Sequence, residues 1–227
     1  MELVIIRRYY LRIYAMSDIH GCPDAFLDAL SLVDLDDKNN MLILCGDYIH
    51  GGSDSYGIIE KIMELKKKYR NRLVVLMGNH EEDAVDYGFI VDDYCVNEEY
   101  DEKRDKKCLD FISHLDLYYN YRNEVLFCHA GVCEQAGEYW EAGTPDYYYT
   151  GKYPAETGKF CINIVAGHIA AATVAGNLKH KGIYYDGESH YYIDGSTMRS
   201  GYVPVLMYYT KEKKFYEVTK SGIEELN

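Results

Sequence analysis

The chain contains little proline, no paired-cysteine motif and no long apolar run. Only 4 of its 227 residues are proline, and its 7 cysteines include no Cys-x-x-Cys pair, so neither a proline-rich linker nor a cysteine zinc site is indicated. No apolar run approaches the roughly 18 residues of a membrane span, and the apolar patch at the start is too short for a secretory signal. Scattered thiols in odd number are typical of reducing compartments, so a cytoplasmic location is expected.

Positive charge is also scarce. Lys and Arg number 24 against 37 Asp and Glu, which gives a formal net charge of −13. A balance this acidic argues against binding to nucleic acid polymers and to anionic membranes. It does not exclude a small phosphorylated substrate, because bound metal ions can supply positive charge locally.

Five short apolar runs predict β-strands that are buried on both faces. These runs lie at residues 11–16, 41–45, 73–77, 125–128 and 161–166. Helical patterns separate the early runs: one begins at Pro23, and another is capped by Ser53 or Asp54. The alternation of strands and helices predicts an α/β fold with right-handed crossovers.

The pattern changes in the second half of the chain. Tyrosine-rich runs at 183–186, 190–194 and 203–209 are separated by Gly and Asp, which predicts antiparallel hairpins. Earlier, a segment at about 88–112 is dense in charge of both signs and predicts a solvated helix or a lid over a substrate. No repeat or clear boundary interrupts the sequence, so a single domain over residues 1–227 is expected.

Side chains that can bind metal ions follow each of the five apolar runs. In chain order they are Asp18, His20, Asp47, Asn79, His129 and His168. Ligands of open α/β sheets bind outside the carboxyl ends of the strands, so these side chains are expected at one edge. Asp18 and His20 are two residues apart and would point the same way in an extended chain.

Carboxylate, imidazole and carboxamide groups without a thiolate suit Mn, Fe, Zn or Mg rather than copper or an iron–sulfur cluster. One carboxylate shared by two such ions holds them about 3.5–4 Å apart, and the pair can polarise a phosphoryl group. The residue types therefore indicate a dinuclear metal site for phosphoester chemistry.

The motifs around these residues resemble those of the calcineurin-like metallophosphoesterases, and most closely those of the bacterial and phage serine/threonine protein phosphatases. They are Asp18-Ile19-His20-Gly21, Gly46-Asp47-Tyr48-Ile49, Gly78-Asn79-His80-Glu81, His129-Ala130-Gly131 and Gly167-His168. The resemblance implies a four-layer α/β/β/α sandwich and a dinuclear metal site.

The resemblance also implies a role for each residue. Asp18, His20 and Asp47 would bind the first metal, and Asp47, as the bridge, would bind the second together with Asn79, His129 and His168. Manganese is favoured among the candidate metals. A solvent hydroxide held between the ions would attack phosphorus in line. His80 would protonate the leaving oxygen, a form of help typically worth 10²–10⁴-fold, or would help to orient the phosphoryl group.

Two positions depart from the family pattern. The family Asp that pairs with the catalytic His is His50 here, and the family Arg that grips the phosphate is Gly51. A second family Arg, expected shortly after Trp140, is absent as well. A neutral imidazole does not raise the pKa of His80 as a carboxylate would. Lys152 and Arg199 are the candidate substitutes for the lost arginines, with His50 and Asn79 as further substrate contacts.

Three functions remain open at this point. The expected one is hydrolysis of phosphomonoesters, in the manner of phosphoserine and phosphothreonine phosphatases. The alternative is a nucleoside polyphosphate hydrolase of the diadenosine tetraphosphate type, or a phosphodiesterase. A third is a protein that retains the metals but turns over slowly and binds a phosphorylated ligand.

Overall fold

Two β-sheets lie face to face in the computed structural model, which describes residues 11–91, 95 and 98–227. The first sheet has the strand order β11-β10-β9-β1-β2-β3. Its strands are β1 (Arg12–Met16), β2 (Asn40–Leu44), β3 (Leu73–Val75), β9 (Leu206–Tyr209), β10 (Lys214–Thr219) and β11 (Gly222–Glu225). Strands β1, β2 and β3 are parallel, whereas β9 joins β1 in antiparallel fashion.

The second sheet has the order β4-β5-β6-β8-β7. Its strands are β4 (Tyr118–Tyr121), β5 (Val125–Cys128), β6 (Asn163–Ala166), β7 (Tyr184–Tyr185) and β8 (His190–Tyr192). Strands β5, β6 and β8 are parallel, and β4 and β7 pair with them in antiparallel fashion at the two edges. All five apolar runs thus form the predicted strands, distributed over two sheets.

Alternate side chains of the central strands enter different layers of the core, because successive residues of a strand face opposite sides. Ile13 and Ala15 pack between the two sheets, whereas Tyr14 and Met16 pack under α1 (Pro23–Leu30) and α2 (Ser55–Tyr69). Pro23 opens α1, and the Asp54 carboxylate caps α2 by accepting from the amide of Gly57 at 2.8 Å.

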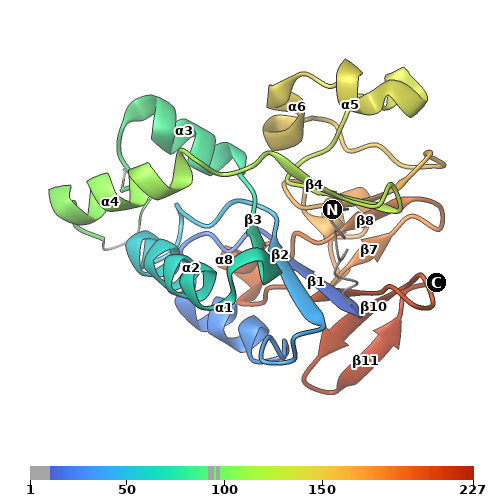
Figure 1. Ribbon diagram of the computed structural model, residues 1–227, viewed down its shortest axis with the longest axis horizontal. Coiled ribbons are helices and arrows are strands. Elements are labelled where there is room, and N and C mark those ends of the chain that lie inside the picture. The colour runs from blue at the N-terminus through green and yellow to red at the C-terminus, as the bar shows by residue number, and fades with distance from the viewer. Residues whose placement is uncertain (1–10, 92–94, 96–97) are drawn as a thin grey trace, which may run out of the picture.

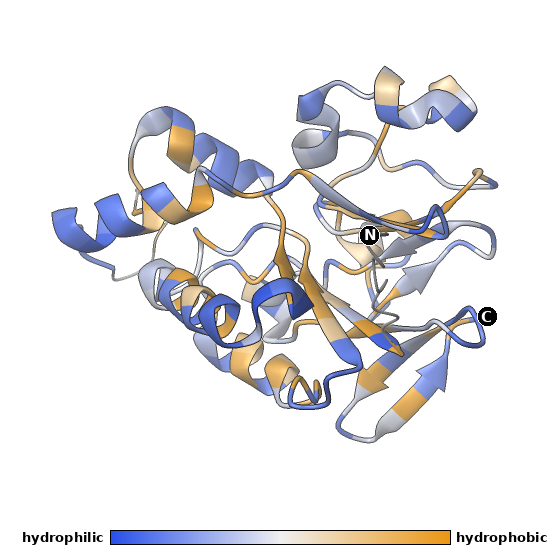
Figure 2. Ribbon diagram, viewed as in Figure 1, coloured by the Kyte–Doolittle hydropathy of each residue, from blue (hydrophilic) through white to orange (hydrophobic). Residues whose placement is uncertain are grey.

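The outer face of the second sheet is covered by α5 (Trp140–Gly143), α6 (Asp146–Gly151) and α7 (Ala171–Val174). Figure 1 shows α1 and α2 on one side of the strands and α5 and α6 on the other. Figure 2 shows the apolar strands in the middle and helices whose outward faces are polar. The predicted four-layer α/β/β/α sandwich is therefore confirmed.

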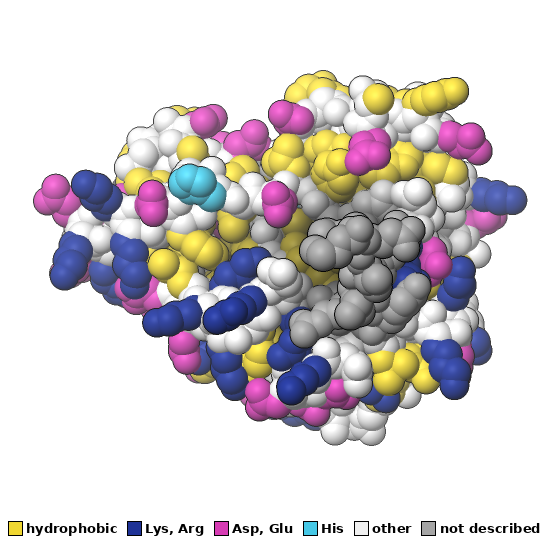
Figure 3. Space-filling view, viewed as in Figure 1, with side chains coloured by type: hydrophobic (Ala, Val, Ile, Leu, Met, Phe, Trp, Pro, Cys, Tyr) yellow, Lys and Arg dark blue, Asp and Glu magenta, His cyan; other side chains and the backbone are white. Residues whose placement is uncertain are grey.

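Of two further helices, α4 (Glu102–Ile112) lies beside α2, and α3 (Asn79–Tyr87) lies against α4 and α6. Cys108 and Ile112 of α4 are buried in the core beneath α2, while its exposed face carries both signs of charge (Figure 3). The Tyr56 hydroxyl of α2 donates to the Asp105 carboxylate of α4 at 2.9 Å. Residues 92–94 and 96–97 of the charged segment lie outside the described residues, and a lid function for 88–112 stays a prediction.

The predicted hairpins form in part as expected. Strands β7 and β8 make one hairpin, but the run at 203–209 does not pair with them. It becomes β9, which crosses to the first sheet and pairs with β1 and β10. Short helices lie at α8 (Thr197–Ser200), Arg70–Arg72 and Glu134–Tyr139. In the described part of the chain, no helix combines the length and apolarity that a membrane crossing requires.

Candidate metal centre

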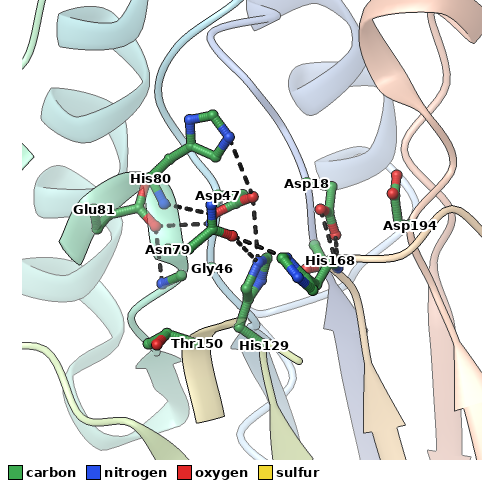
Figure 4. A network of polar contacts seen from close by, with 12 residues as sticks. Asp18, Gly46, Asp47, Asn79, His80, Glu81, His129, Thr150, His168 and Asp194 are labelled. Atoms are coloured by element: carbon green, nitrogen blue, oxygen red, sulfur yellow. Dashed lines mark hydrogen bonds and ion pairs between the residues drawn. The ribbon is translucent and has the colours of Figure 1, made fainter. Parts of the chain in front are cut away.

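The loops that follow β1, β2, β3, β5 and β6 meet at the carboxyl ends of these strands and bring the six predicted ligands together. Figure 4 labels all six except His20. Asp47 lies at the centre. Its Oδ2 atom is 3.2 Å from His129 Nε2 and 3.8 Å from both His20 Nε2 and His80 Nε2. The ligand atoms of Asp47, His20 and His80 lie within 4.8 Å of one another, and so do those of Asp47, His129 and His168. Asp47 is thus common to two groups, and the first of them contains His80 in place of the predicted ligand Asp18.

The donor set fits a cation. His129 Nδ1 lies 2.8 Å from the carbonyl oxygen of Cys45, which can only accept, so Nδ1 carries a proton and a neutral ring presents its lone pair at Nε2. That Nε2 faces Asp47 Oδ2 at 3.2 Å and Asn79 Oδ1 at 3.1 Å. Asn79 Oδ1 also lies 2.9 Å from His168 Nδ1. The lone pairs of His129 Nε2, Asp47 Oδ2 and Asn79 Oδ1 thus face one another in a buried place. A cation bound between them would remove their mutual repulsion.

The pKa values of the central residues are strongly shifted by burial and by one another. Burial would raise the pKa of Asp47, but the neighbouring His129, His80 and His20 hold it well below its usual range. Burial would lower the pKa of His129, but Asp47 and Asp18 raise it to about 10. The two carboxylates thus concentrate negative charge around His129. Burial and the charge of His129 lower the pKa of His168 to about 4.

Two buried acids, Asp18 and Asp194, flank this cluster. Asp18 and Asp194 are 1% and 8% exposed, and Figure 4 shows them next to each other. Burial, with the charge of Asp194, raises the pKa of Asp18 well above its usual range, and burial raises the pKa of Asp194 as well. Asp18 Oδ1 lies 3.9 Å from His20 Nε2. Asp194 was not predicted as a site residue, although it follows an apolar run in the same way as the others.

The backbone of Asp18 and His20 is not extended, and this part of the prediction is wrong. Both residues adopt the left-handed conformation, with φ of 55° and 50°, and Asp47 does so with φ of 57°. Such non-glycine residues are strained. The two loops hold each other in place, because the carbonyl oxygen of Asp47 accepts from the amides of Ile19 and His20 at 2.8 and 3.0 Å. The side chains therefore converge through a tight turn.

Glu81 organises the same loop, and the sequence analysis assigned it no role. It is fully buried, and its carboxylate accepts from the amides of Gly78, Asp47 and Tyr48 at 3.0, 2.8 and 2.8 Å. Burial and the Asp47 charge raise its pKa to about 7. Its position at N3 of α3 matches the acidic half of a capping box, a signal that was readable in the sequence.

His80 and His50 form a pair. Their Nδ1 atoms lie 2.9 Å apart, and His50 Nε2 lies 3.0 Å from the carbonyl oxygen of Ile90. Because that carbonyl only accepts, a neutral His50 donates through Nε2 and accepts at Nδ1 from His80. His80 Nε2 is then left facing Asp47. His50 is 5% exposed with both ring nitrogens engaged, so the geometry does not favour the predicted contact between His50 and substrate.

Burial lowers the pKa of His80, and the neighbouring imidazoles of His20, His50 and His129 lower it further, against the opposing effect of Asp47. The family carboxylate that would have the opposite influence is missing, as the sequence showed. His50 therefore holds His80 in a defined orientation, but the surroundings of His80 disfavour its doubly protonated, imidazolium form.

Lys152, a predicted phosphate contact, is engaged elsewhere. Its side chain is buried, its amine donates to the carbonyl oxygen of Val132, and its Nζ lies 2.6 Å from Glu156 Oε2 and 3.5 Å from Glu134 Oε1. The same Glu134 lies 3.0 Å from His190 Nε2, whose other ring nitrogen is 2.9 Å from Asp186 Oδ2. Lys152 therefore belongs to a buried charge network that holds the second sheet to its covering loops.

We expect His190→Gln to destabilise the protein more at pH 6 than at pH 9. Burial would lower the pKa of His190, but Glu134 and Asp186 raise it above its usual value. A raised folded-state pKa gives stability that is fully present below the unfolded value near 6.5 and is lost as pH rises through the folded value. The loss at pH 6 should be about 1–3 kcal/mol, measured by urea unfolding. Equal losses at both pH values, or an equal effect of exposed His114→Gln, would contradict this.

Arg199, the other predicted substitute, does reach the site's border. It lines a hollow of about 420 Å³ together with His20, Asp194, Ser196, Thr197 and Met198. Of these described lining residues, Arg199 contributes the one permanent positive charge. It lies on α8, which begins immediately after Ser196, a residue in the left-handed conformation with φ of 53°.

Comparison with known proteins gives a consistent set of relatives. A family model described as calcineurin-like phosphoesterase matches residues 11–192. A symmetrical bis(5'-nucleosyl)-tetraphosphatase from Wigglesworthia glossinidia brevipalpis is 37% identical over 68 residues, which are 30% of this chain and 24% of the relative. One from Nitrosomonas europaea is 27% identical over 123 residues, 52% of this chain and 44% of the relative. The chain thus spans less than half the length of either relative.

Solved structures resemble the fold over nearly the whole chain. A cold-active protein-tyrosine phosphatase from a psychrophilic Shewanella species superposes with a TM-score of 0.67 at 17% identity, covering 98% of this chain and 83% of that one. A putative diadenosine tetraphosphatase superposes with a TM-score of 0.64 at 19% identity, covering 91% and 92%. At these identities the likeness concerns the fold alone.

Proposed function

The chain belongs to the calcineurin-like phosphoesterase family, and from that premise we propose that it is a metal-dependent hydrolase of nucleoside polyphosphates. The observation that carries the proposal is the convergence of five other metal-capable side chains and His80 around Asp47. We expect cleavage of a phosphoric anhydride bond in a dinucleoside polyphosphate rather than of a phosphoserine ester.

Asp18, His20 and Asp47 would hold one divalent ion, and Asp47, Asn79, His129 and His168 would hold a second, with manganese as the first metal to test. When bound, the ions supply Lewis-acid polarisation of the phosphoryl group and activation of the attacking water. Three imidazoles around Asp47 are already turned inward by the surrounding loops. Glu81 supports this arrangement by fixing the amides of Asp47 and Tyr48.

His80 would face the leaving oxygen. Its Nδ1 is held by His50, which leaves Nε2 on the side of Asp47. A neutral imidazole behind His80 cannot stabilise its doubly protonated form as a carboxylate would. An alkoxide leaving group needs that proton, whereas a phosphate anion released from an anhydride is stable without it. The pair of histidines therefore favours an anhydride substrate.

The relatives support the same substrate class. Both are named symmetrical bis(5'-nucleosyl)-tetraphosphatase, which matches the alternative reading of the sequence better than phosphomonoester hydrolysis does. The absence of both family arginines, at Gly51 and after Trp140, also weakens the side-chain grip expected for a single terminal phosphate.

A turnover panel with manganese-loaded protein tests this proposal. We expect kcat/KM for diadenosine tetraphosphate to exceed that for a phosphoserine peptide and for bis-p-nitrophenyl phosphate by at least about 10-fold. Chromatography of the nucleotide products would show which anhydride bond is cleaved. Preference for the phosphopeptide would overturn the proposal in favour of a protein phosphatase, and no turnover on any substrate would favour a binding protein.

A further inference from the structure

A second cavity adjoins the metal-ligand cluster. It has a volume of about 810 Å³, within the roughly 300–1,000 Å³ typical of sites for small organic ligands. It shares Asp194, Ser196 and Arg199 with the hollow that reaches His20, so the two spaces meet along one wall. The cavity is formed where α7 and the segment at 178–182 face the end of β10.

The walls of the cavity combine two kinds of surface. Ala170, Ala171, Leu178 and the ring of Tyr202 provide small or apolar contacts. Three cationic side chains, those of Lys179, Lys181 and Arg199, stand around them. Within the described part of the chain, we find no side-chain hydrogen bond or ion pair for these three, so their charges are available to an anion in the cavity.

The acidic residues that line the cavity do not neutralise these cations. Glu217 accepts from the Tyr202 hydroxyl at 3.0 Å and faces the amide of Ile183 at 3.5 Å. Asp194 accepts from the amide of Ser196 and lies on the side of Asp18. Three cations that have no partner among the described residues therefore line the two connected spaces. Arg199 stands where they meet, near His20, and Lys179 and Lys181 stand in the larger cavity.

We propose that this cavity binds the nucleoside diphosphate portion of the substrate that lies farther from the metal ligands. Arg199 would contact the phosphate next to the bond that is cleaved, Lys179 and Lys181 the phosphate beyond it, and the apolar wall the nucleoside. The inference rests on the proposed function and deepens it. It also explains how a site without the two family arginines holds a polyanion: the cations lie along the chain of phosphates instead of around one phosphate.

The double variant Lys179→Met/Lys181→Met tests the charge. We expect the ratio of kcat/KM for diadenosine tetraphosphate to that for p-nitrophenyl phosphate, which has no second phosphate, to fall about 10-fold. Lys38→Met/Lys67→Met, at exposed positions before β2 and near the end of α2, removes the same charge away from the cavity and serves as the matched control. An equal fall in the control, or no fall in the cavity variant, would overturn the proposal.

Binding of ADP to chelator-treated protein, measured by calorimetry, gives a readout that does not depend on turnover. The chelator removes the ions through which the metal-ligand cluster would hold a phosphate, so the binding that remains reports the cavity. We expect the double variant and Thr173→Trp, which narrows the cavity at an exposed position without changing charge, each to weaken ADP binding about 10-fold. Wild-type affinity in both variants, or no binding to wild type, would overturn the proposal.

The two hypotheses fail separately. If wild type hydrolyses p-nitrophenyl phosphate but no nucleoside polyphosphate, the proposed function fails, and the ADP measurement still decides on the cavity. If diadenosine tetraphosphate is hydrolysed equally by wild type and by the cavity variants, the proposed function stands and the cavity assignment fails.

Discussion

Replacing Asp47 by asparagine should lower turnover by more than about 100-fold and reduce the bound metal below one ion per chain. Asp47 is 3% exposed, and its Oδ2 faces three imidazoles while its Oδ1 accepts from the amide of His80 at 3.1 Å. Asparagine keeps the shape and the oxygen but removes the charge that two ions would share. Metal content after gel filtration, measured by mass spectrometry, and turnover of p-nitrophenyl phosphate check the result.

A thermal measurement separates loss of metal from loss of fold. Manganese at about 100 times its dissociation constant should stabilise wild type by about 2.7 kcal/mol, and Asp47→Asn should lose most of this gain. Asp83→Asn, on the exposed side of α3, provides the matched control because it makes the same chemical change away from the cluster. If Asp47→Asn kept two ions and near wild-type turnover, Asp47 would not be the bridge.

The ligands around Asp47 could be predicted from sequence because each follows a short apolar run. Parallel strands deliver the residues after them to a common edge, and this rule holds here even though the strands divide between two sheets. The helix starts at Pro23 and after Asp54 were readable for a similar reason, since both depend on local capping chemistry. Their roles as ligands stay predictions until metal binding is measured.

The features that could not be predicted depend on contacts between distant segments. His50 Nε2 contacts the carbonyl oxygen of Ile90, which is 40 residues away in the sequence, and no motif near His50 predicts that contact. The position of Lys152 in the sequence suggested a phosphate contact. In the structure its side chain is buried, and its amine pairs with Glu134 and Glu156 instead. The left-handed turn at Asp18 and His20 arises from backbone bonds to the loop after β2, so an extended pair was the wrong premise.

Replacing His80 by asparagine should lower turnover most for substrates with poor leaving groups. A general acid contributes typically 10²–10⁴-fold, and the contribution grows as the leaving oxygen becomes more basic. The slope of log kcat/KM against leaving-group pKa, measured with a series of aryl phosphates, should become steeper in His80→Asn. Exposed His114→Asn should leave the slope unchanged. Equal losses across the series would show that His80 orients the phosphoryl group without donating a proton.

His50 provides the sharper version of the same experiment, because it separates orientation of His80 from its proton affinity. His50→Asn can still accept from His80 through Oδ1, which takes the place of Nδ1, so it should retain more activity than His50→Leu. The Leu variant should lose about 10–100-fold, as when the partner that orients a site residue is removed. His50→Asp restores a carboxylate behind His80, which favours its protonated form, and should flatten the leaving-group slope relative to wild type. A slope that is the same in Asp, Asn and wild-type proteins would mean that His50 has no influence on proton transfer. Flattening confined to the Asp variant would show that the imidazole at this position limits proton donation by His80.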